Sequence, residues 1–225
     1  MIQKLTKLFI LIIPLTITSK VHSQNQKIAI ISIEDTMIVR CHVGLTIFSN
    51  FTDTLDIKAP IGTFIENTLA KYLSPDYDVE IIKVPSNIRN NTTTFFGRSK
   101  EYKAWIKEIE PKYNIIILVE NIAVPDVMNI KVPAKTSGFY TRMSRKYIYS
   151  TITFNAYKTD PRKELEYYNM GGKFLTEIKD FDLPEDKRTF SKSGLAYIQE
   201  ALLVHIDKRI LYFLHKSFLS PNAGM

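Results

Sequence analysis

The sequence predicts an α/β fold: a mixed sheet with a parallel βαβ core, a C-terminal antiparallel hairpin and a long final helix. Three observations lead to this prediction. Short apolar runs of strand length alternate with segments whose apolar residues recur at helical spacing, as in parallel sheets covered by helices. Two strand-like segments flank a short turn at "KTDPR", which is typical of a hairpin. One apolar stripe then continues from about Ser193 to Phe218.

The first half of the chain supplies the βαβ elements. "KIAIISI" (27–33) is almost wholly apolar and predicts a buried strand, and an alternating strand follows at 38–48. Pro60 favours a helix start, because its missing N–H is not needed there. "VEIIKV" (79–84) and "NIIILVEN" (114–121) predict two further strands. One-sided apolar stripes predict the two intervening helices, with Ile61, Phe64, Ile65, Leu69, Tyr72 and Leu73 on the first and Tyr102, Trp105, Ile106 and Ile109 on the second.

The second half begins with a predicted irregular segment at 122–146, because Pro125, Pro133 and Gly138 interrupt any long element. "VMNIKV" within it is compatible with a short strand. The hairpin then consists of "YIYSTITFNAY" (147–157) and "KELEYYNM" (163–170), and "GGKFLTEIKDF" offers one more strand before the final helix.

Residues 1–23 have the order of a secretory signal peptide. Lys4 and Lys7 precede an apolar run at 8–18, and Val21 and Ser23 form a suitable cleavage site. The run is about half the length of the roughly 20 apolar residues that a spanning helix needs. An uncleaved membrane anchor and a buried first strand are the alternatives. We expect cleavage after Ser23, export to the periplasm or beyond, and one folded domain at 24–225 with no transmembrane segment.

Charge and cysteine content exclude several classes of protein. Three of the 30 Lys and Arg lie in the predicted signal, which leaves 27 against 23 Asp and Glu. Such a small excess does not indicate a nucleic-acid binder. Cys41 is the only cysteine, so no intramolecular disulfide can form, and its place on the apolar side of strand 38–48 predicts a buried thiol. The composition, rich in Lys, Ile and Asn, is typical of a bacterial protein.

Motifs for cofactor or metal chemistry are absent from the sequence, so we expect no cofactor and no metal. It contains no HExxH, no CxxC, no phosphate-binding glycine loop and no GxSxG. Glu34 and Asp35 follow the first strand, where α/β sheets bind ligands, and form an alternative ligand site. The simpler interpretation of this acidic pair is an ordinary surface turn. These observations favour a protein that is not an enzyme.

A candidate contact face lies around strand 147–157. Tyrosine and arginine are enriched at protein interfaces, and such a surface also suits anionic glycans or lipid headgroups. Its predicted partner-binding residues are Tyr140, Arg142, Arg145, Lys146, Tyr147, Tyr149 and Tyr157. The alternative is a sheet face covered by the protein's own final helix.

The order of elements resembles a domain of bacterial envelope proteins. The elements that carry the resemblance are "KIAIISI", "IGTFIENTLAKYL", "YDVEII", "EYKAWIKEIE", "YNIIILVENI", "STITFNAYKTDPRKELEYY" and the final helix. The similar domains are those of the curli secretion channel subunit, the lipoprotein activators of penicillin-binding proteins and the amino-terminal part of the Tol propeller protein. This chain departs from them in three ways: the turn "KTDPRKE" lacks their glycine, no acylation cysteine is present, and strand 38–48 is additional.

The resemblance implies an accessory or assembly role rather than catalysis. We therefore expect an exported, non-enzymatic envelope protein that binds a protein partner or an anionic envelope component. The alternative is an exported hydrolase or small-ligand binder that uses Glu34 and Asp35. No pattern in the sequence indicates an oligomeric state.

Overall fold

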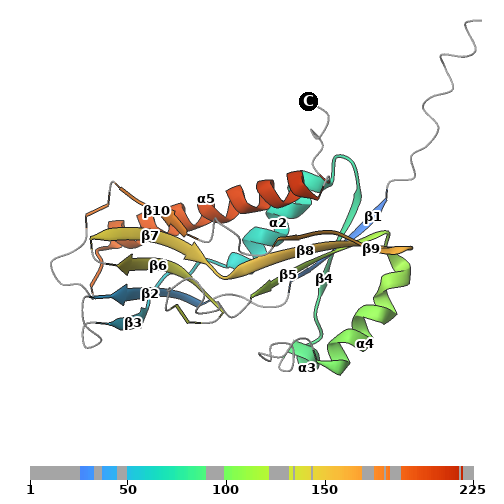
Figure 1. Ribbon diagram of the computed structural model, residues 1–225, viewed down its shortest axis with the longest axis horizontal. Helices are drawn as coiled ribbons and strands as arrows, with labels where there is room; N and C mark the ends of the chain where they lie inside the picture. Colours follow the sequence, from blue (N-terminus) through green and yellow to red (C-terminus); the bar gives the residue numbers. More distant parts are fainter. Residues whose placement is uncertain are drawn as a thin grey trace, which may run out of the picture.

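The computed structural model shows two five-stranded sheets, with helices on both sides of the first (Figure 1). It describes residues 26–32, 37–44, 50–89, 99–121, 132–133, 135–142, 144–168, 175–179, 181–182, 189–217 and 219. The predicted α/β class, the parallel core and the long final helix are confirmed. Among the described residues, no helix is long and apolar enough to cross a membrane.

The first sheet contains the predicted parallel core and the hairpin. Its strand order is β4–β1–β5–β8–β9. Strand β1 lies between β4 and β5 and is parallel to both, whereas β5, β8 and β9 are antiparallel neighbours. The strand bounds are β1 (Lys27–Ser32), β4 (Asp78–Lys83), β5 (Ile115–Asn121), β8 (Ile152–Thr159) and β9 (Arg162–Tyr168).

The second sheet was not expected, because the sequence predicted one mixed sheet; it lies beside the first, and β7 leads into β8 (Figure 1). Its strand order is β10–β7–β6–β2–β3, with β2 parallel to β6 and the other neighbours antiparallel. The additional alternating strand at 38–48 is β2, so it belongs to this sheet rather than to the core. The bounds are β2 (Met37–Val43), β3 (Phe51–Thr54), β6 (Thr136–Arg142), β7 (Arg145–Ser150) and β10 (Leu175–Glu177).

The predicted irregular segment at 122–146 is wrong in its second half, where β6 runs and β7 begins. Gly138 is part of β6 and does not break it. A Cβ at this position would lie 2.2 Å from the carbonyl oxygen of Val39, and residues with side chains rarely adopt its φ of +143°. The glycine therefore permits the close approach of β2 to β6. The possible strand "VMNIKV" lies outside the described residues apart from Val132.

The predicted strand 147–157 is divided between the two sheets. Strand β7 ends at Ser150 and β8 begins at Ile152. Thr151 lies between them; its N–H donates to the carbonyl of Thr136 over 3.1 Å, and its hydroxyl donates to the same carbonyl over 2.8 Å. The continuous alternation in the sequence concealed this break.

The helices cover the sheets as their apolar stripes require. Helices α2 (Ile61–Leu73) and α5 (Lys192–Lys216) pack on one face of the first sheet, and α4 (Lys100–Ile109) packs on the other. A short helix α3 (Ser86–Arg89) and a 3₁₀ turn η3 (Glu110–Lys112) flank α4. The hydroxyls of Ser99 and Ser191 cap α4 and α5 by accepting backbone N–H bonds over 3.1 Å each.

Helix α5 continues beyond the first sheet onto the second. It contacts β6 and β7 as well as β9 and α2, so it holds the two sheets in one body. Buried Arg209 reinforces this arrangement at the break between β7 and β8: its guanidinium donates to the carbonyl of Ser150 over 2.9 Å and also to that of Ile152. Strands and helix are therefore joined at the point where the chain passes from one sheet to the other.

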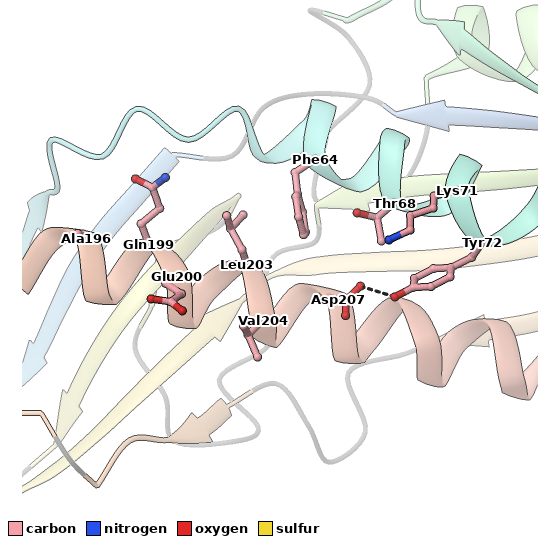
Figure 2. A pocket seen from close by; sticks show the side chains of 10 residues that line it. All are labelled: Phe64, Thr68, Lys71, Tyr72, Ala196, Gln199, Glu200, Leu203, Val204 and Asp207. Carbon is pink, nitrogen blue, oxygen red and sulfur yellow. Dashed lines mark hydrogen bonds between the residues drawn. The ribbon is translucent and has the colours of Figure 1, made fainter.

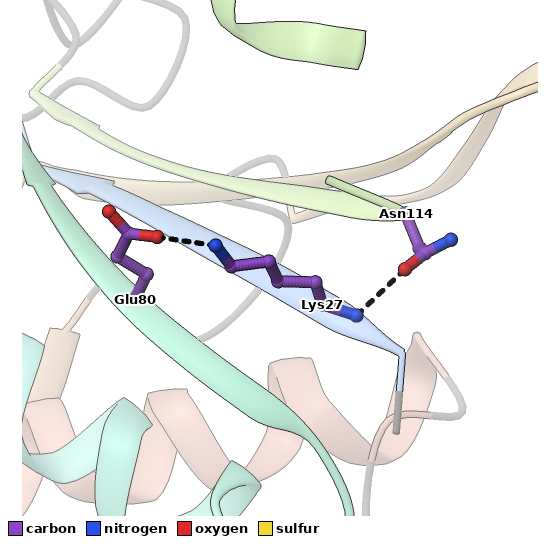
Figure 3. A network of polar contacts seen from close by, with 3 residues as sticks. All are labelled: Lys27, Glu80 and Asn114. Atoms are coloured by element: carbon purple, nitrogen blue, oxygen red, sulfur yellow. Dashed lines mark hydrogen bonds and ion pairs between the residues drawn. The ribbon is translucent and has the colours of Figure 1, made fainter. Parts of the chain in front are cut away.

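The start of β1 is held by polar contacts on both sides (Figure 3). The ammonium of Lys27 lies 2.9 Å from the Glu80 carboxylate on β4 and 5.0 Å from the ring centre of Tyr113. Its backbone N–H donates to the side-chain oxygen of Asn114 over 2.8 Å. These contacts fix the first residue of β1 against β4 on one side and against the start of β5 on the other.

Candidate functional site

A groove lies between α2 and α5 (Figure 2). Its volume is about 510 Å³, and it opens to solvent. The lining residues are Phe64, Thr68, Lys71 and Tyr72 from α2, and Ala196, Gln199, Glu200, Leu203, Val204 and Asp207 from α5. No sequence motif pointed to this site.

Helical spacing builds the two walls of the groove. On α2, Phe64 and Thr68 are one turn apart, beside the stripe of Ile65 and Leu69 that is buried against the sheet. On α5, Leu203 and Val204 lie beside the buried positions in the same way. Each helix therefore presents a second, partly exposed apolar edge to the groove in addition to its buried face.

Charged side chains stand on both rims. Lys71 is on the α2 side, and Glu200 and Asp207 are on the α5 side. One end is closed by Tyr72, whose hydroxyl donates to a carboxylate oxygen of Asp207 over 3.0 Å. Partial burial, and then this bond to Asp207, raise the pKa of Tyr72 above its ordinary value. The groove thus combines an apolar floor with rims of opposite charge.

The predicted contact face is largely inaccessible. Tyr149 has no exposed surface, and Tyr140 and Tyr157 are 1% and 5% exposed. Tyr149 and Tyr140 pack with Val39 and Cys41 on one side of the second sheet, whereas Tyr157 lies beneath α4 and donates to Glu110 over 3.1 Å. These three tyrosines are core residues and cannot contact a partner.

The rest of that face gathers at the turn between β6 and β7. Arg142 and Arg145 are opposite each other in the register and are exposed. Lys146 donates to the carbonyl of Phe181, and the Tyr147 ring lies 6.0 Å from that of Tyr140. The exposed part of the predicted face is therefore a pair of arginines, and their role in binding stays a prediction.

Cys41 is fully buried, as the alternation predicted. Its sulfur lies 3.5 Å from the hydroxyl of Tyr149, and that hydroxyl lies 2.9 Å from the Thr136 hydroxyl. Burial raises the pKa of the Cys41 thiol and opposes formation of the reactive thiolate. The thiol is a packing group.

The alternative ligand site at Glu34 and Asp35 lies outside the described residues, so it too stays a prediction. The predicted cleavage site at Ser23 likewise lies outside them. Among the described residues, no cluster of three or more His, Cys, Asp and Glu could hold a metal ion.

Sequence reasoning missed the groove because it assigned each helix one apolar face. The available signal was a set of apolar residues off the main stripe of the last helix. Leu203 and Val204 line the groove, and Val204 remains 47% exposed, whereas the neighbouring stripe position Leu202 is fully buried. These residues predict a helix with two apolar sides.

No family model and no curated protein matches the chain. Two solved structures are similar to it. Protein XCC0632 from Xanthomonas campestris, described with the family model DUF330, is 6% identical with a TM-score of 0.41, over 85% of this chain and 83% of that one. The hypothetical protein CT253 from Chlamydia trachomatis is 7% identical with a TM-score of 0.37, over 84% and 98%. Similarity at these values carries no argument about function.

Proposed function

We propose that this chain is an exported, non-enzymatic protein of the bacterial envelope that binds a protein partner in the α2–α5 groove. The observation that carries the proposal is the groove itself, with its apolar floor and charged rims. Such a groove suits the apolar side of an amphipathic segment, because apolar side chains leave water on the floor while the rim charges fix the orientation. The role is accessory: it consists of holding another protein rather than of transforming a substrate.

The rim charges indicate what the bound segment should carry. Glu200 and Asp207 on α5 favour a basic residue on that side, and Lys71 on α2 favours an acidic residue on the other. Asp207 also accepts a hydrogen bond from Tyr72, so Glu200 is the rim carboxylate more open to a partner. The partner is therefore an amphipathic segment with charges of opposite sign on its two edges.

The envelope location rests on the amino-terminal pattern and on the resemblance of the element order to envelope assembly domains. Both are arguments from sequence, and the second is an analogy of fold. They are compatible with a groove that holds proteins, since assembly factors act by binding.

The experiment is site-specific photo-crosslinking in the native host. A photoreactive residue replaces Thr68, which lines the groove, or Thr63, which is exposed on the same helix away from the groove. We expect a discrete protein adduct in the envelope fraction from position 68 and none from position 63. Absence of an adduct at position 68, or equal adducts at both positions, would exclude the groove as the binding site.

A second variant tests the affinity of the groove without crosslinking. Thr68→Arg places a long charged side chain over the apolar floor, whereas Thr63→Arg adds the same charge on the solvent side. Once the adduct has identified the partner, Thr68→Arg should weaken its binding roughly tenfold or more, because a charge must then be desolvated. The control should bind as the wild type does, and both melting temperatures should stay unchanged.

The alternative proposal, a hydrolase or small-ligand binder at Glu34 and Asp35, has its own test. A screen of metabolites and metal ions should yield a ligand that raises the melting temperature, and Asp35→Ala should abolish this shift. A screen without any such shift removes the support for that alternative.

A further inference from the structure

The outward side of α5 carries three large apolar residues at a regular spacing. Tyr197, Val204 and Leu211 are seven residues apart and between 36% and 47% exposed. The ring of Tyr197 stacks on that of Phe181 with 4.9 Å between the ring centres, so the part of Tyr197 that stays exposed is the part open to a partner. Seven residues make almost two turns of an α-helix, so the three side chains form a stripe along the helix. Seven-residue spacing of apolar side chains is what a second helix packs against in coiled coils.

Two charges lie within this stripe and are arranged symmetrically. Glu200 and Lys208 are both exposed, carry opposite charges, and are each four residues from Val204. Tyr197 and Leu211 are each seven residues from Val204. If a second copy of the helix is placed antiparallel with its Val204 opposite this Val204, Tyr197 faces Leu211 and Glu200 faces Lys208. This is the property of a surface that complements a copy of itself.

We propose that α5 forms the interface of a homodimer, in which the α5 helices of two copies pack antiparallel about a two-fold axis at Val204. Tyr197 then lies against Leu211 of the partner subunit, and Glu200 lies against Lys208 of the partner subunit. The axis repeats each contact, so the interface is isologous and closed. One helix pair makes a small interface, and the dimer is therefore weak and concentration-dependent.

The charges favour a second copy over the other possible occupants. An anionic membrane surface attracts helices whose polar borders are basic. Here Glu200 lies within the stripe and Asp207 lies beside it. Binding of an unrelated protein would explain the exposed apolar residues, but it would not explain why Glu200 and Lys208 lie symmetrically about Val204. Only a copy of this chain uses both features.

The dimer and the groove are adjacent but separable. Glu200 and Val204 also line the groove, whereas Tyr197, Lys208 and Leu211 do not. Leu211→Glu therefore tests the dimer alone, and Thr68→Arg tests the groove alone. Failure of one proposal leaves the other standing.

Sedimentation equilibrium of the full chain, purified from its host, is the primary experiment. We expect the average mass to rise toward that of a dimer between about 1 and 500 µM. Leu211→Glu should raise the dissociation constant roughly tenfold or more, since it places a charge in each of two symmetric contacts. A monomer at all concentrations, or a dimer that Leu211→Glu leaves unchanged, overturns the proposal.

Charge reversal tests the predicted pairing. Glu200→Lys and Lys208→Glu should each weaken the dimer, because each places like charges opposite one another twice. The double variant restores opposite charges across the axis and should recover the wild-type constant. Failure of the double variant to recover, with its melting temperature unchanged, contradicts the antiparallel register.

Cysteine crosslinking distinguishes antiparallel from parallel helices. A mixture of Tyr197→Cys and Leu211→Cys chains should form a mixed disulfide dimer under mild oxidation, and neither variant should crosslink with itself. Cys41 is buried in every sample and gives a constant background. Self-crosslinking of Tyr197→Cys would show parallel packing and overturn the two-fold axis at Val204. Binding of the monomer to anionic vesicles would assign the stripe to a lipid surface and likewise overturn the proposal.

Discussion

At the scale of single residues, two polar side chains are buried on the otherwise apolar inner face of α5. His205 and Arg209 are each 3% exposed. The Nδ1 atom of His205 lies 2.8 Å from the Thr176 hydroxyl on β10, and Arg209 bonds to the break between β7 and β8. Both polar groups thus attach the second sheet to the helix.

Titration of His205 makes stability depend on pH. Burial, and then the positive charges of Arg209 and Lys208, lower its pKa to about 3 in the folded chain. The unfolded chain takes up the proton near pH 6.5, so between these values the unfolded state binds more protons and stability falls as pH falls. The loss approaches about 1.4 kcal/mol per pH unit below pH 6.

Urea unfolding of wild type and His205→Gln between pH 7 and pH 4 checks this expectation. Carboxylates titrate in both proteins, so the difference between the two stabilities isolates the histidine. We expect wild type to lose stability faster than His205→Gln as the pH falls. A difference that stays constant with pH would contradict the buried neutral histidine.

Alternation along a strand predicted which residues lie on its apolar side, but not whether the opposite side is also buried. Alternation correctly placed Cys41 in the core. The same alternation placed Tyr149 opposite Ile148, but it could not show that both sides of the second sheet are covered. Tyr149 was therefore assigned to an open face although it is buried.

At the scale of elements, α5 depends on Arg209 for its position over both sheets. Arg209→Met keeps most of the side-chain length but leaves the carbonyls of Ser150 and Ile152 without the guanidinium that now bonds to them. The expected loss is about 3 kcal/mol of unfolding free energy, because buried hydrogen bonds to a charged group are lost. Lys216→Met, at an exposed position on the same helix, should change stability by less than about 0.5 kcal/mol.

Hydrogen exchange locates the effect of Arg209→Met. The amide of Thr151 donates to the carbonyl of Thr136 and should exchange faster in Arg209→Met than in Lys216→Met. Equal protection of this amide in both variants would show that the guanidinium does not hold the break.

Element type followed from local sequence, whereas strand pairing depended on contacts distant in the chain. The periodicity of 61–73 and 100–109 was sufficient to predict α2 and α4. The division of 147–157 at Thr151 was not predictable, since it depends on Thr136 and on Arg209. Gly138 was read as a breaker because the approach of β2 cannot be seen in its own segment.

At the scale of the whole molecule, the two sheets lie side by side along one long helix, α5, and the groove and the outward stripe both belong to that helix (Figure 1). Local patterns predicted the α/β class and the parallel core, since each parallel strand is a near-continuous apolar run. The groove was not predicted, because it arises from the distance between α2 and α5, which are more than a hundred residues apart in sequence. Surfaces formed between distant elements leave only the weak signal of apolar residues outside the main stripe.

The position of β1 limits where a signal peptidase could cut without removing part of the first sheet. Strand β1 begins at Lys27 and is central to the parallel core, with Glu80 and Asn114 holding its first residue (Figure 3). Cleavage after Ser23 leaves three residues before the strand and keeps every one of these contacts, whereas cleavage within β1 would remove them. We therefore expect intact-mass analysis of the native host to find a species that begins at Gln24 in the periplasmic or external fraction. A species that retains Met1 in the membrane fraction would indicate a tethered domain, and full-length protein in the cytosol would exclude export, because the signal would then have been neither recognised nor cut.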